Sequence, residues 1–354
     1  MTVSLCMIVK NEEEVLERCL SSAAELVDEI IIVDTGSEDD TPNIAKKFGS
    51  KLFSFAWIDD FAAARNYAFS LGTCEYLLWL DADDFITPES AESFRKLKAD
   101  LERETPDIVQ CPYEIVSDGK PVLKFMRERI VKRSAGFEWQ GRVHECITPR
   151  GKIINSDFCV QHLGSSKPRG SRNLNIYRKW ASEEALDGRN LFYYGRELYY
   201  NGFFEEAEKI LEKMLGGDGW FVNKIEACLV LADTRRALKN NESAFFSLFE
   251  SFRYGEPRAK ICIKIAELYH ETNRLNEAEY WYKAAMLCRD HSAEGDFEDD
   301  YARSLTPLLG LCRIAFERGD LKNSYEYHKQ AEALFPNHPA VEYNRNYFLS
   351  HPVE

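Results

Sequence analysis

The residues most able to do chemistry form an acidic cluster in the first quarter of the chain. Asp81 and Asp83 lie one residue apart, and Asp84 follows directly after the apolar run 76–80. Two carboxylates at this spacing in an exposed loop can share a hard divalent cation with a diphosphate. The alternative is an acidic turn that ends a strand and caps a helix, because such pairs also arise by chance.

A further carboxylate, Asp34, ends the β-branched run 29–33 and precedes a Thr35-Gly36-Ser37 turn. At the end of a parallel strand it could accept hydrogen bonds from a base or a ribose. An Asx turn at a strand-to-helix connection explains the same residues equally well.

Alternating strand and helix patterns must position these acids. Strands are predicted at 3–9, 29–33, 51–57 and 75–80. Helices are expected between them, and Asn11 with Glu14 resembles the capping box of the first helix. This order predicts an α/β domain with a mainly parallel sheet and helices on both faces. Ligands bind such sheets beyond the carboxyl ends of the strands, where Asp34 and Asp81 are expected.

Later segments change character twice. Residues 107–164 predict strands and loops that extend the sheet and close over the site, and the alternation at 127–133 is typical of an edge or hairpin strand. A polar stretch with proline and glycine follows, so we expect a linker at 166–175 between a first domain at 1–165 and a second at 176–354.

The second domain is expected to be all-helical and repetitive. Small residues that fit one position of the tetratricopeptide pattern recur at Ala207, Ala244, Ala278 and Ser324. Their spacing matches a repeat of about 34 residues if insertions fall at 216–219 and 291–301. About four repeats are predicted, and such arrays usually present a concave surface to peptide or protein partners.

Composition excludes several classes of protein. The 354 residues carry 45 Lys+Arg against 59 Asp+Glu, a net charge of −14, which argues against nucleic-acid binding. The apolar runs are far shorter than the ~20 residues of a membrane-spanning helix. The N-terminus is typical of a first strand rather than a signal peptide. Ten cysteines without a CxxC pair predict a reduced, cytoplasmic protein.

Four motifs together resemble a known family. They are SLCMIVKNEE at 4–13, VDTGSEDDT at 33–41, FAAARN at 61–66 and LDADD at 80–84. In this order they are similar to family 2 glycosyltransferases of the GT-A fold. More narrowly, they resemble a bacterial subgroup that joins this domain to tetratricopeptide repeats. Some of its members, the glycocin S-glycosyltransferases, attach sugars to peptide cysteines.

The resemblance implies a role for individual residues. Those implied to bind the nucleotide-sugar are Val9, Asn11, Glu12, Asp34, Arg65, Asn66, Asp81 and Ala82. Asp83 would ligate Mn²⁺ or Mg²⁺, and His162 would be a further metal or diphosphate ligand. Without the motifs, Arg65 would be taken for a surface ion pair with Asp59 or Asp60. A lone strand-end histidine such as His162 is more often a structural hydrogen-bonding group.

An inverting transfer needs a base near the acceptor nucleophile. The segment 141–145 resembles the GxxHE motif of the subgroup, which makes Glu145 the first choice for the base, with His144 orienting it. Glu138 is the alternative base, and a hydrogen-bonded pair at a strand end is the non-catalytic interpretation. Trp139 could stack on a sugar or pack in the core. A thiol acceptor would ease the demand on the base, because a cysteine is partly ionised near its pKa of ~8.5.

Basic residues follow His162 in the sequence. Lys167, Arg169 and Arg172 could fold over the diphosphate as a lid, or they could belong to a solvated linker.

These observations predict a metal-dependent inverting glycosyltransferase that uses a nucleotide-sugar, with a UDP-sugar expected, and a peptide or protein acceptor held by the repeats. An enzyme of cell-surface polysaccharide or glycolipid synthesis is the nearest alternative. A repeat scaffold with a degenerate nucleotide-sensing domain is the alternative of another class. The aromatic residues at 245–252 are expected to fill the core between repeats, with a remainder available for a homodimer.

Overall fold

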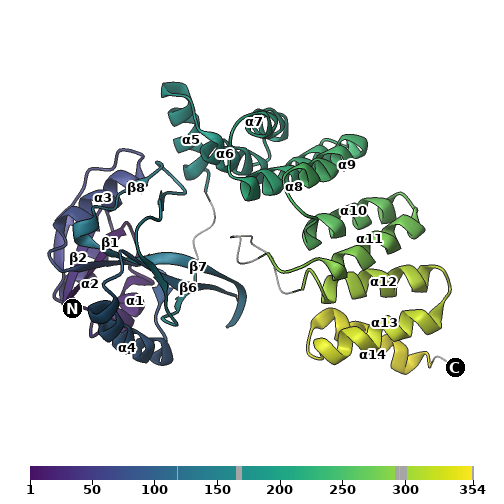
Figure 1. Cartoon of the computed structure of the whole chain (residues 1–354), viewed down its shortest axis with the longest axis horizontal. Helices are drawn as coiled ribbons and strands as arrows, with labels where there is room; N and C mark the ends of the chain where they lie inside the picture. Colours follow the sequence, from purple (N-terminus) through teal and green to yellow (C-terminus); the bar gives the residue numbers. More distant parts are fainter. Residues whose placement is uncertain (118, 165–169, 292–294, 296–300, 353–354) are drawn as a thin grey trace. The chain divides into compact units, whose positions relative to one another are not determined.

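The computed structural model describes residues 1–117, 119–164, 170–291, 295 and 301–352. Contacts between residues divide the chain into two compact units, Met1–Ala185 and Leu186–Glu354 (Figure 1). Helix α5 (Arg172–Glu183), which begins inside the segment expected to be a linker, packs in the first unit. Its Lys179 binds Asp59, with 2.7 Å between Nζ and Oδ2.

The first unit alternates strands and helices as predicted. Its elements before the hairpin are β1 (Val3–Val9), α1 (Leu16–Ala23), β2 (Glu29–Asp34), α2 (Thr41–Lys47), β3 (Lys51–Ser54), α3 (Phe61–Leu71), β4 (Tyr76–Trp79), β5 (Asp84–Phe85) and α4 (Pro88–Glu104). The later ones are β6 (Ile108–Ser117), β7 (Lys120–Lys132), η1 (Arg133–Ala135), β8 (Trp139–Gln140), β9 (Cys146–Ile147), β10 (Ile153–Asn155), β11 (Val160–His162) and α5.

One mixed sheet organises the first unit. Its strand order is β3-β2-β1-β4-β7-β6-β11-β5, with β10 also paired to β6. The first four strands are parallel, so their carboxyl ends meet at one edge. Strand β7 forms a hairpin with β6, as predicted, and also pairs antiparallel with β4, which makes it an interior strand. Strand β7 therefore joins the four parallel strands to the later strands of the sheet, the extension that was expected to close over the site.

Helices cover both faces of the sheet. Alternate residues of β1 point to opposite sides: Leu5 and Met7 join the core beneath α1, α2 and α4, while Cys6 joins the core beneath α3. The second core also contains Trp79 and Trp139. The residues after β1 and β4 are therefore held between two packed layers.

The start of α1 differs from the prediction. Asn11 adopts a left-handed conformation, with φ +54°, and the helix begins at Leu16 instead. Asn11 Oδ1 accepts a hydrogen bond from the Glu38 N–H over 2.7 Å, so its side chain ties two loops together rather than capping α1. A residue with positive φ ends strand β1 sharply and cannot enter a right-handed helix.

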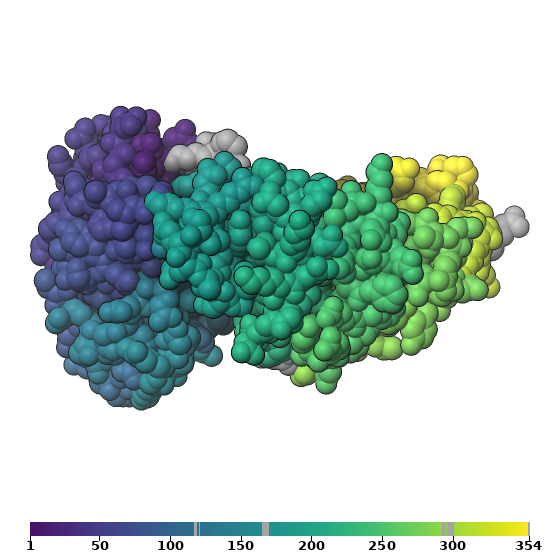
Figure 2. All heavy atoms as spheres, turned by 90° about the horizontal axis from the view of Figure 1, so that it is seen from above, coloured from purple at the N-terminus to yellow at the C-terminus, as the bar shows by residue number. Residues whose placement is uncertain are grey.

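The second unit is built from helix pairs. Its elements are α6 (Gly188–Tyr200), α7 (Phe204–Gly216), α8 (Phe221–Ala237), α9 (Asn241–Glu250), η2 (Ser251–Arg253), α10 (Ala259–Glu271), α11 (Leu275–Leu287), α12 (Leu305–Glu317), α13 (Leu321–Leu334) and α14 (Pro339–Ser350). In the space-filling view of Figure 2 the residues of this unit run from teal to yellow. The four small residues of the predicted pattern, Ala207, Ala244, Ala278 and Ser324, are all fully buried. The first expected insertion, 216–219, lies where α7 ends and before α8 begins, and most of the second, 291–301, lies outside the described residues.

The aromatic residues of α9 and η2 mainly fill the space between repeats, as expected. Phe249 and Phe252 lie 5.6 and 6.1 Å from Trp281 of α11, measured between ring centroids, and Phe245 lies 4.7 Å from Tyr269. Phe246 is instead 66% exposed, and Phe249 keeps 36% of its surface exposed despite its contact with Trp281. Among the described residues, no helix is long and apolar enough to cross a membrane.

A buried carboxylate fastens the amino-terminal edge of the sheet. Glu29 of β2 accepts hydrogen bonds from Ser4 of β1, Lys51 of β3 and Thr73 before β4. Burial opposes ionisation, but these hydrogen bonds outweigh it and lower the pKa of Glu29 to about 2.

We predict that Glu29→Gln destabilises the protein by about 2–3 kcal/mol at pH 7, because the ionised form is the one stabilised by folding. The contribution of Glu29 is complete above its ordinary pKa of 4.5 and is lost as the pH falls towards 2. Urea unfolding of both proteins should therefore converge across this range. The exposed Glu25→Gln is the control, and a difference that persists unchanged at pH 2 would contradict the assignment.

The repeat packing gives a second stability prediction. A Cβ on Gly310 would lie 2.4 Å from Cζ of the buried Tyr282, whereas a Cβ on the helical Gly216 would have no neighbour within 4 Å. Gly310→Ala gains about 1 kcal/mol of helix propensity, but overpacking costs typically 1–3 kcal/mol. We expect Gly310→Ala to lower the urea midpoint and Gly216→Ala to leave it unchanged or raised. Equal stability of the two variants would show that α11 and α12 do not approach this closely.

Candidate functional site

A pocket of about 410 Å³ lies at the carboxyl ends of the parallel strands. It is formed by the end of β1 and the loop after it, the turn after β2, the start of α3, the acidic turn after β4 and the first residue of α5. Its lining residues are Ile8, Val9, Lys10, Asn11, Glu12, Thr35, Trp57, Phe61, Arg65, Asp81, Ala82, Asp83 and Arg172.

Most of the residues expected to bind the nucleotide-sugar line this pocket. These are Val9, Asn11, Glu12, Arg65, Asp81, Ala82 and Arg172, with the expected metal ligand Asp83 beside them. Asp34, Asn66, His144, Glu145 and His162 are not among the lining residues. Lys167 and Arg169 lie outside the described residues.

Asp34 serves the turn in which it lies. Its carboxylate accepts hydrogen bonds from the backbone N–H of Ser37, over 3.2 Å, and from the Ser37 hydroxyl. The carboxylate thus stabilises its own turn, as the local alternative supposed, although it reaches three residues along the chain rather than the two of an Asx turn. Thr35, the next residue, contributes to the pocket wall in its place.

Arg65 is the centre of the pocket floor. Its Nη2 lies 2.6 Å from Asp81 Oδ1, and its Nε lies 2.6 Å from Glu145 Oε1. The guanidinium also lies over the rings of Trp79 and Trp139, 5.2 and 4.8 Å from their centroids. A planar guanidinium can bridge two carboxylates and stack at the same time, which a lysine cannot do.

The neighbouring aspartates have other partners, so the simple surface pair expected without the motifs is not formed. Asp60 caps α3 by accepting a hydrogen bond from the Ala63 N–H over 2.8 Å. Asp59 binds Lys179 and accepts a hydrogen bond from Trp57 Nε1 over 3.0 Å. Arg65 is consequently free to turn inward, where it is 8% exposed.

Asn66 and Trp139 are structural in this arrangement. The Asn66 side chain donates to the Trp139 carbonyl over 3.0 Å and accepts from the Trp139 N–H over 2.8 Å, which pins β8 to α3. Trp139 is 3% exposed and packs edge-on against Trp79, with ring centroids 4.9 Å apart. Of its two possible roles, the indole occupies the core.

Of the residues considered for the base and its orientation, Glu145 contacts a pocket-lining residue, Arg65. Glu145 is 11% exposed at its side chain and is held by Arg65, whereas Glu138, the residue before β8, is exposed. His144 has a positive φ of +52°, and its ring stacks on Tyr177 of α5 with 6.3 Å between centroids. A strained backbone at a motif residue is typical of functional sites.

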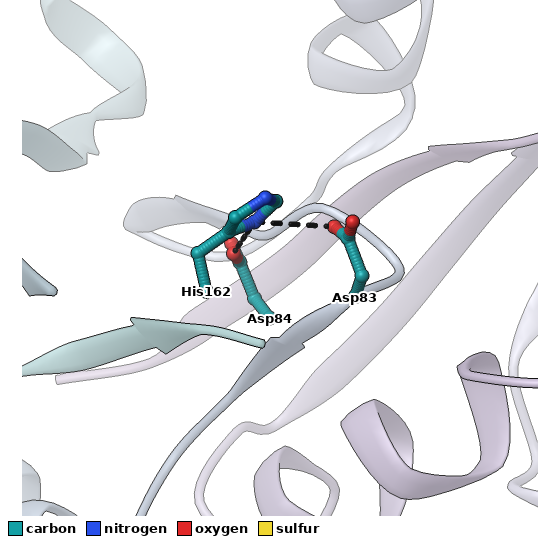
Figure 3. Close-up of side chains that lie close together, drawn as sticks. All are labelled: Asp83, Asp84 and His162. Carbon is teal, nitrogen blue, oxygen red and sulfur yellow. Dashed lines mark hydrogen bonds and ion pairs between the residues drawn. The ribbon is translucent and has the colours of Figure 1, made fainter. Parts of the chain in front are cut away.

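The acidic turn meets His162 beside the pocket. Strand β11 pairs antiparallel with β5, which sets His162 opposite Asp84. His162 Nδ1 lies 3.4 Å from Asp83 Oδ1 and 3.4 Å from Asp84 Oδ1, as Figure 3 shows. One donor atom from each residue falls within 4.8 Å of the other two. The structure therefore brings together the two residues expected to bind metal and adds Asp84.

Electrostatics distinguishes the carboxylates of the turn. Burial acts to raise the pKa of Asp81, but the charges of Arg65 and Arg129 hold it at about 2. Burial, reinforced by the charges of Asp81 and Asp84, raises the pKa of Asp83 to about 6 against the opposing effect of His162. Burial opposes protonation of His162, yet its hydrogen bond to Asp84 and the charge of Asp83 raise its pKa.

The donor set fits a divalent cation. Carboxylate oxygens suit Mg²⁺ and Mn²⁺, and an imidazole suits the later first-row metals. Asp83, with a raised pKa beside other carboxylates, is the group whose ionised form a cation would stabilise most.

Several pocket residues were missed by sequence reasoning. Trp57 and Phe61 lie edge-on, 4.7 Å apart, and the guanidinium of Arg172 lies 4.8 Å from the Phe61 ring. Trp57 follows the third parallel strand, so the rule applied to Asp34 and Asp81 would have found it. Lys10 stands inside the first motif and could have been found in the same way.

Comparison with known proteins agrees with this geometry. Residues 4–160 match the family described as glycosyl transferase family 2. A tetratricopeptide repeat-containing protein of Synechococcus elongatus is 41% identical, across 94% of this chain and 76% of the relative. This chain belongs to the family 2 glycosyltransferases.

Other relatives extend the comparison. The SPbeta prophage-derived glycosyltransferase SunS of Bacillus subtilis is 29% identical, across 91% of this chain and 81% of its own length. Among solved structures, residues 1–349 of TarS from S. aureus share 16% identity with a TM-score of 0.41, covering 72% of this chain and 92% of that one. The glycosyltransferase has a GT-A domain followed by a tetratricopeptide-like helical region, which confirms the predicted fold class.

We predict that Arg65→Met lowers kcat/KM for sugar transfer by about 100-fold or more, because two hydrogen bonds to charged groups are lost together. Arg65→Lys should recover part of the activity, since an ammonium group replaces the charge without the planar bridge. The measurement is turnover of the donor sugar, with the thermal midpoint recorded for each variant. Arg95→Met, at an arginine of α4 whose side chain is 56% exposed, is the control. A folded Arg65→Met enzyme with activity within a few-fold of the original would show that the contacts of Arg65 with Asp81 and Glu145 are not needed for sugar transfer.

Proposed function

We propose that this glycosyltransferase is a metal-dependent inverting enzyme that transfers a sugar from a nucleotide-sugar, with UDP as the nucleotide, to a peptide or protein acceptor. The observation that carries the metal dependence is the convergence of Asp83 and His162 beside the pocket, with Nδ1 and Oδ1 3.4 Å apart. The resemblance to the S-glycosyltransferases and the helical repeats support the peptide acceptor.

The donor would lie along the pocket. Backbone groups of Val9, Asn11 and Glu12 would hold the base, because the left-handed turn at Asn11 exposes the end of β1 there. Asp81 would approach the ribose, since Arg65 fixes its carboxylate at that edge of the pocket. Arg172, at the first turn of α5, would reach the diphosphate.

Asp83 and His162 would hold Mn²⁺ or Mg²⁺ next to the diphosphate. When bound, the cation supplies neutralisation of the charge that develops on the departing nucleoside diphosphate. Arg172 adds a positive group on the protein side of the same leaving group. These contacts strengthen as charge develops, which is the requirement for catalysis rather than simple binding.

In the transfer itself, the acceptor nucleophile forms a bond to the anomeric carbon as the bond to the diphosphate oxygen breaks. The proton of the nucleophile passes to a base. We retain Glu145 as the first candidate and the exposed Glu138 as the second. The contact of Glu145 with the pocket-lining Arg65 gives its carboxylate a defined orientation, and a thiol acceptor would need the least assistance.

The test is binding and hydrolysis of UDP-, GDP- and dTDP-sugars, with and without Mn²⁺. We expect one UDP-sugar to turn over only with the metal, and Asp83→Asn to reduce that turnover by about 100-fold or more, because a ligand is lost. Glu92→Gln, at an exposed carboxylate of α4, is the control. Binding of a donor with no turnover would indicate that the acceptor is obligatory. Equal turnover with and without metal would refute the metal-dependent mechanism, and binding of no donor would favour a scaffold.

A further inference from the structure

A buried arginine lies directly behind the acidic turn. Arg129 of β7 has no exposed surface, although it is one of the largest polar side chains in the first unit. Its Nη1 lies 3.0 Å from Asp84 Oδ2 and donates to the Trp79 carbonyl over 3.3 Å. Arg129 therefore links the hairpin to both ends of the segment that leads from β4 into the acidic turn.

The surroundings of Arg129 are costly for a charged group. Its guanidinium lies over the rings of both Trp79 and Tyr113, 3.8 and 4.2 Å from their centroids. Among the described residues, its buried Nε and Nη2 have no hydrogen-bond partner. Buried ion pairs of this kind often stabilise a protein less than apolar residues of similar size. Stability alone therefore does not explain why an arginine is buried here, and its contacts with Asp84 and Trp79 point to a role in holding the acidic turn in place.

Asp84 in turn contacts three parts of the first unit: the turn after β4, strand β6 and strand β11. Oδ2 accepts a hydrogen bond from the Asp81 N–H over 2.9 Å, in addition to the one from Arg129. Oδ1 accepts from the Tyr113 hydroxyl over 2.9 Å and lies 3.4 Å from His162 Nδ1. Both oxygens of this fully buried carboxylate thus already have partners within the protein.

We propose that Asp84 is not itself a metal ligand and that Arg129 and Tyr113 are positioning residues of the metal site, acting through it. Arg129 balances the charge of Asp84, and Tyr113 fixes its rotation. Asp84 then fixes the Asp81–Asp83 turn through the backbone and sets His162 from the side. This inference rests on the proposed metal dependence, and residues that orient ligands in this way commonly change metal affinity by 10–100-fold.

The first experiment compares two tyrosines of the same sheet. Tyr113→Phe removes one hydrogen bond to Asp84, and Tyr76→Phe removes one of similar length, 3.0 Å, to the Pro106 carbonyl. Mn²⁺ affinity is measured by electron paramagnetic resonance in the presence of UDP. We expect about tenfold weaker Mn²⁺ binding in Tyr113→Phe and none of this loss in Tyr76→Phe. UDP affinity without metal should be the same in all three proteins.

The second experiment separates positioning from ligation. Asp83→Asn should abolish measurable Mn²⁺ binding, whereas Asp84→Asn combined with Arg129→Met removes the buried pair without leaving one charge behind and should weaken binding by 10–100-fold. Complete loss in the double variant, with its thermal midpoint maintained, would identify Asp84 as a ligand and overturn the proposal. So would unchanged affinity in Tyr113→Phe while the original protein binds Mn²⁺. Absence of Mn²⁺ binding by the original protein would instead refute the metal dependence from which the inference starts.

Discussion

The constraint on which the first unit depends is the concentration of negative charge at one edge of its sheet. Asp81, Asp83 and Asp84 follow one another there, Arg65 links Glu145 to Asp81, and burying a carboxylate without a partner is expensive. Two arginines meet most of this cost. Arg65 bridges Asp81 and Glu145, and Arg129 pairs with Asp84. The fold thus brings Arg65 of α3 and Arg129 of β7 to the end of β4, where these carboxylates lie.

Trp79 joins the two arginines into one structure. It is the last residue of β4, and the guanidinium groups of Arg65, Arg127 and Arg129 lie 5.2, 5.1 and 3.8 Å from its ring centroid. Its Nε1 donates to the Glu128 carbonyl over 2.6 Å, which ties the indole to β7. Stacking on an aromatic face partly replaces the water that a buried guanidinium loses. The acidic turn therefore follows closely after a tryptophan that is packed against three arginines and hydrogen-bonded to β7.

Much of this could be predicted from the sequence, and the failures have identifiable causes. Strand alternation and the strand-end rule located the parallel sheet, Asp81 and Asp83, and the spacing of small residues located the repeats. Arg129 and Tyr113 were missed because their importance depends on pairing between β7, β6 and β4, which no local pattern records. The capping box was wrong because a hydrogen bond to the distant Glu38 holds Asn11 in a left-handed conformation. Tertiary contacts overrode a good local signal at that position.

The placement of the two arginines also explains why the pKa of Asp83 differs from that of Asp81. Asp81 and Asp84 each have an arginine and are committed to holding the turn in shape. Within the described residues, the ion-pair partner of Asp83 is the imidazole of His162, which is charged only when protonated. Burial beside two ionised aspartates accordingly raises the pKa of Asp83 to about 6, while that of Asp81 stays near 2. The fold pairs Asp81 and Asp84 with arginines but gives Asp83, which lines the pocket, no arginine among the described residues. A bound cation there would stabilise the ionised form of Asp83.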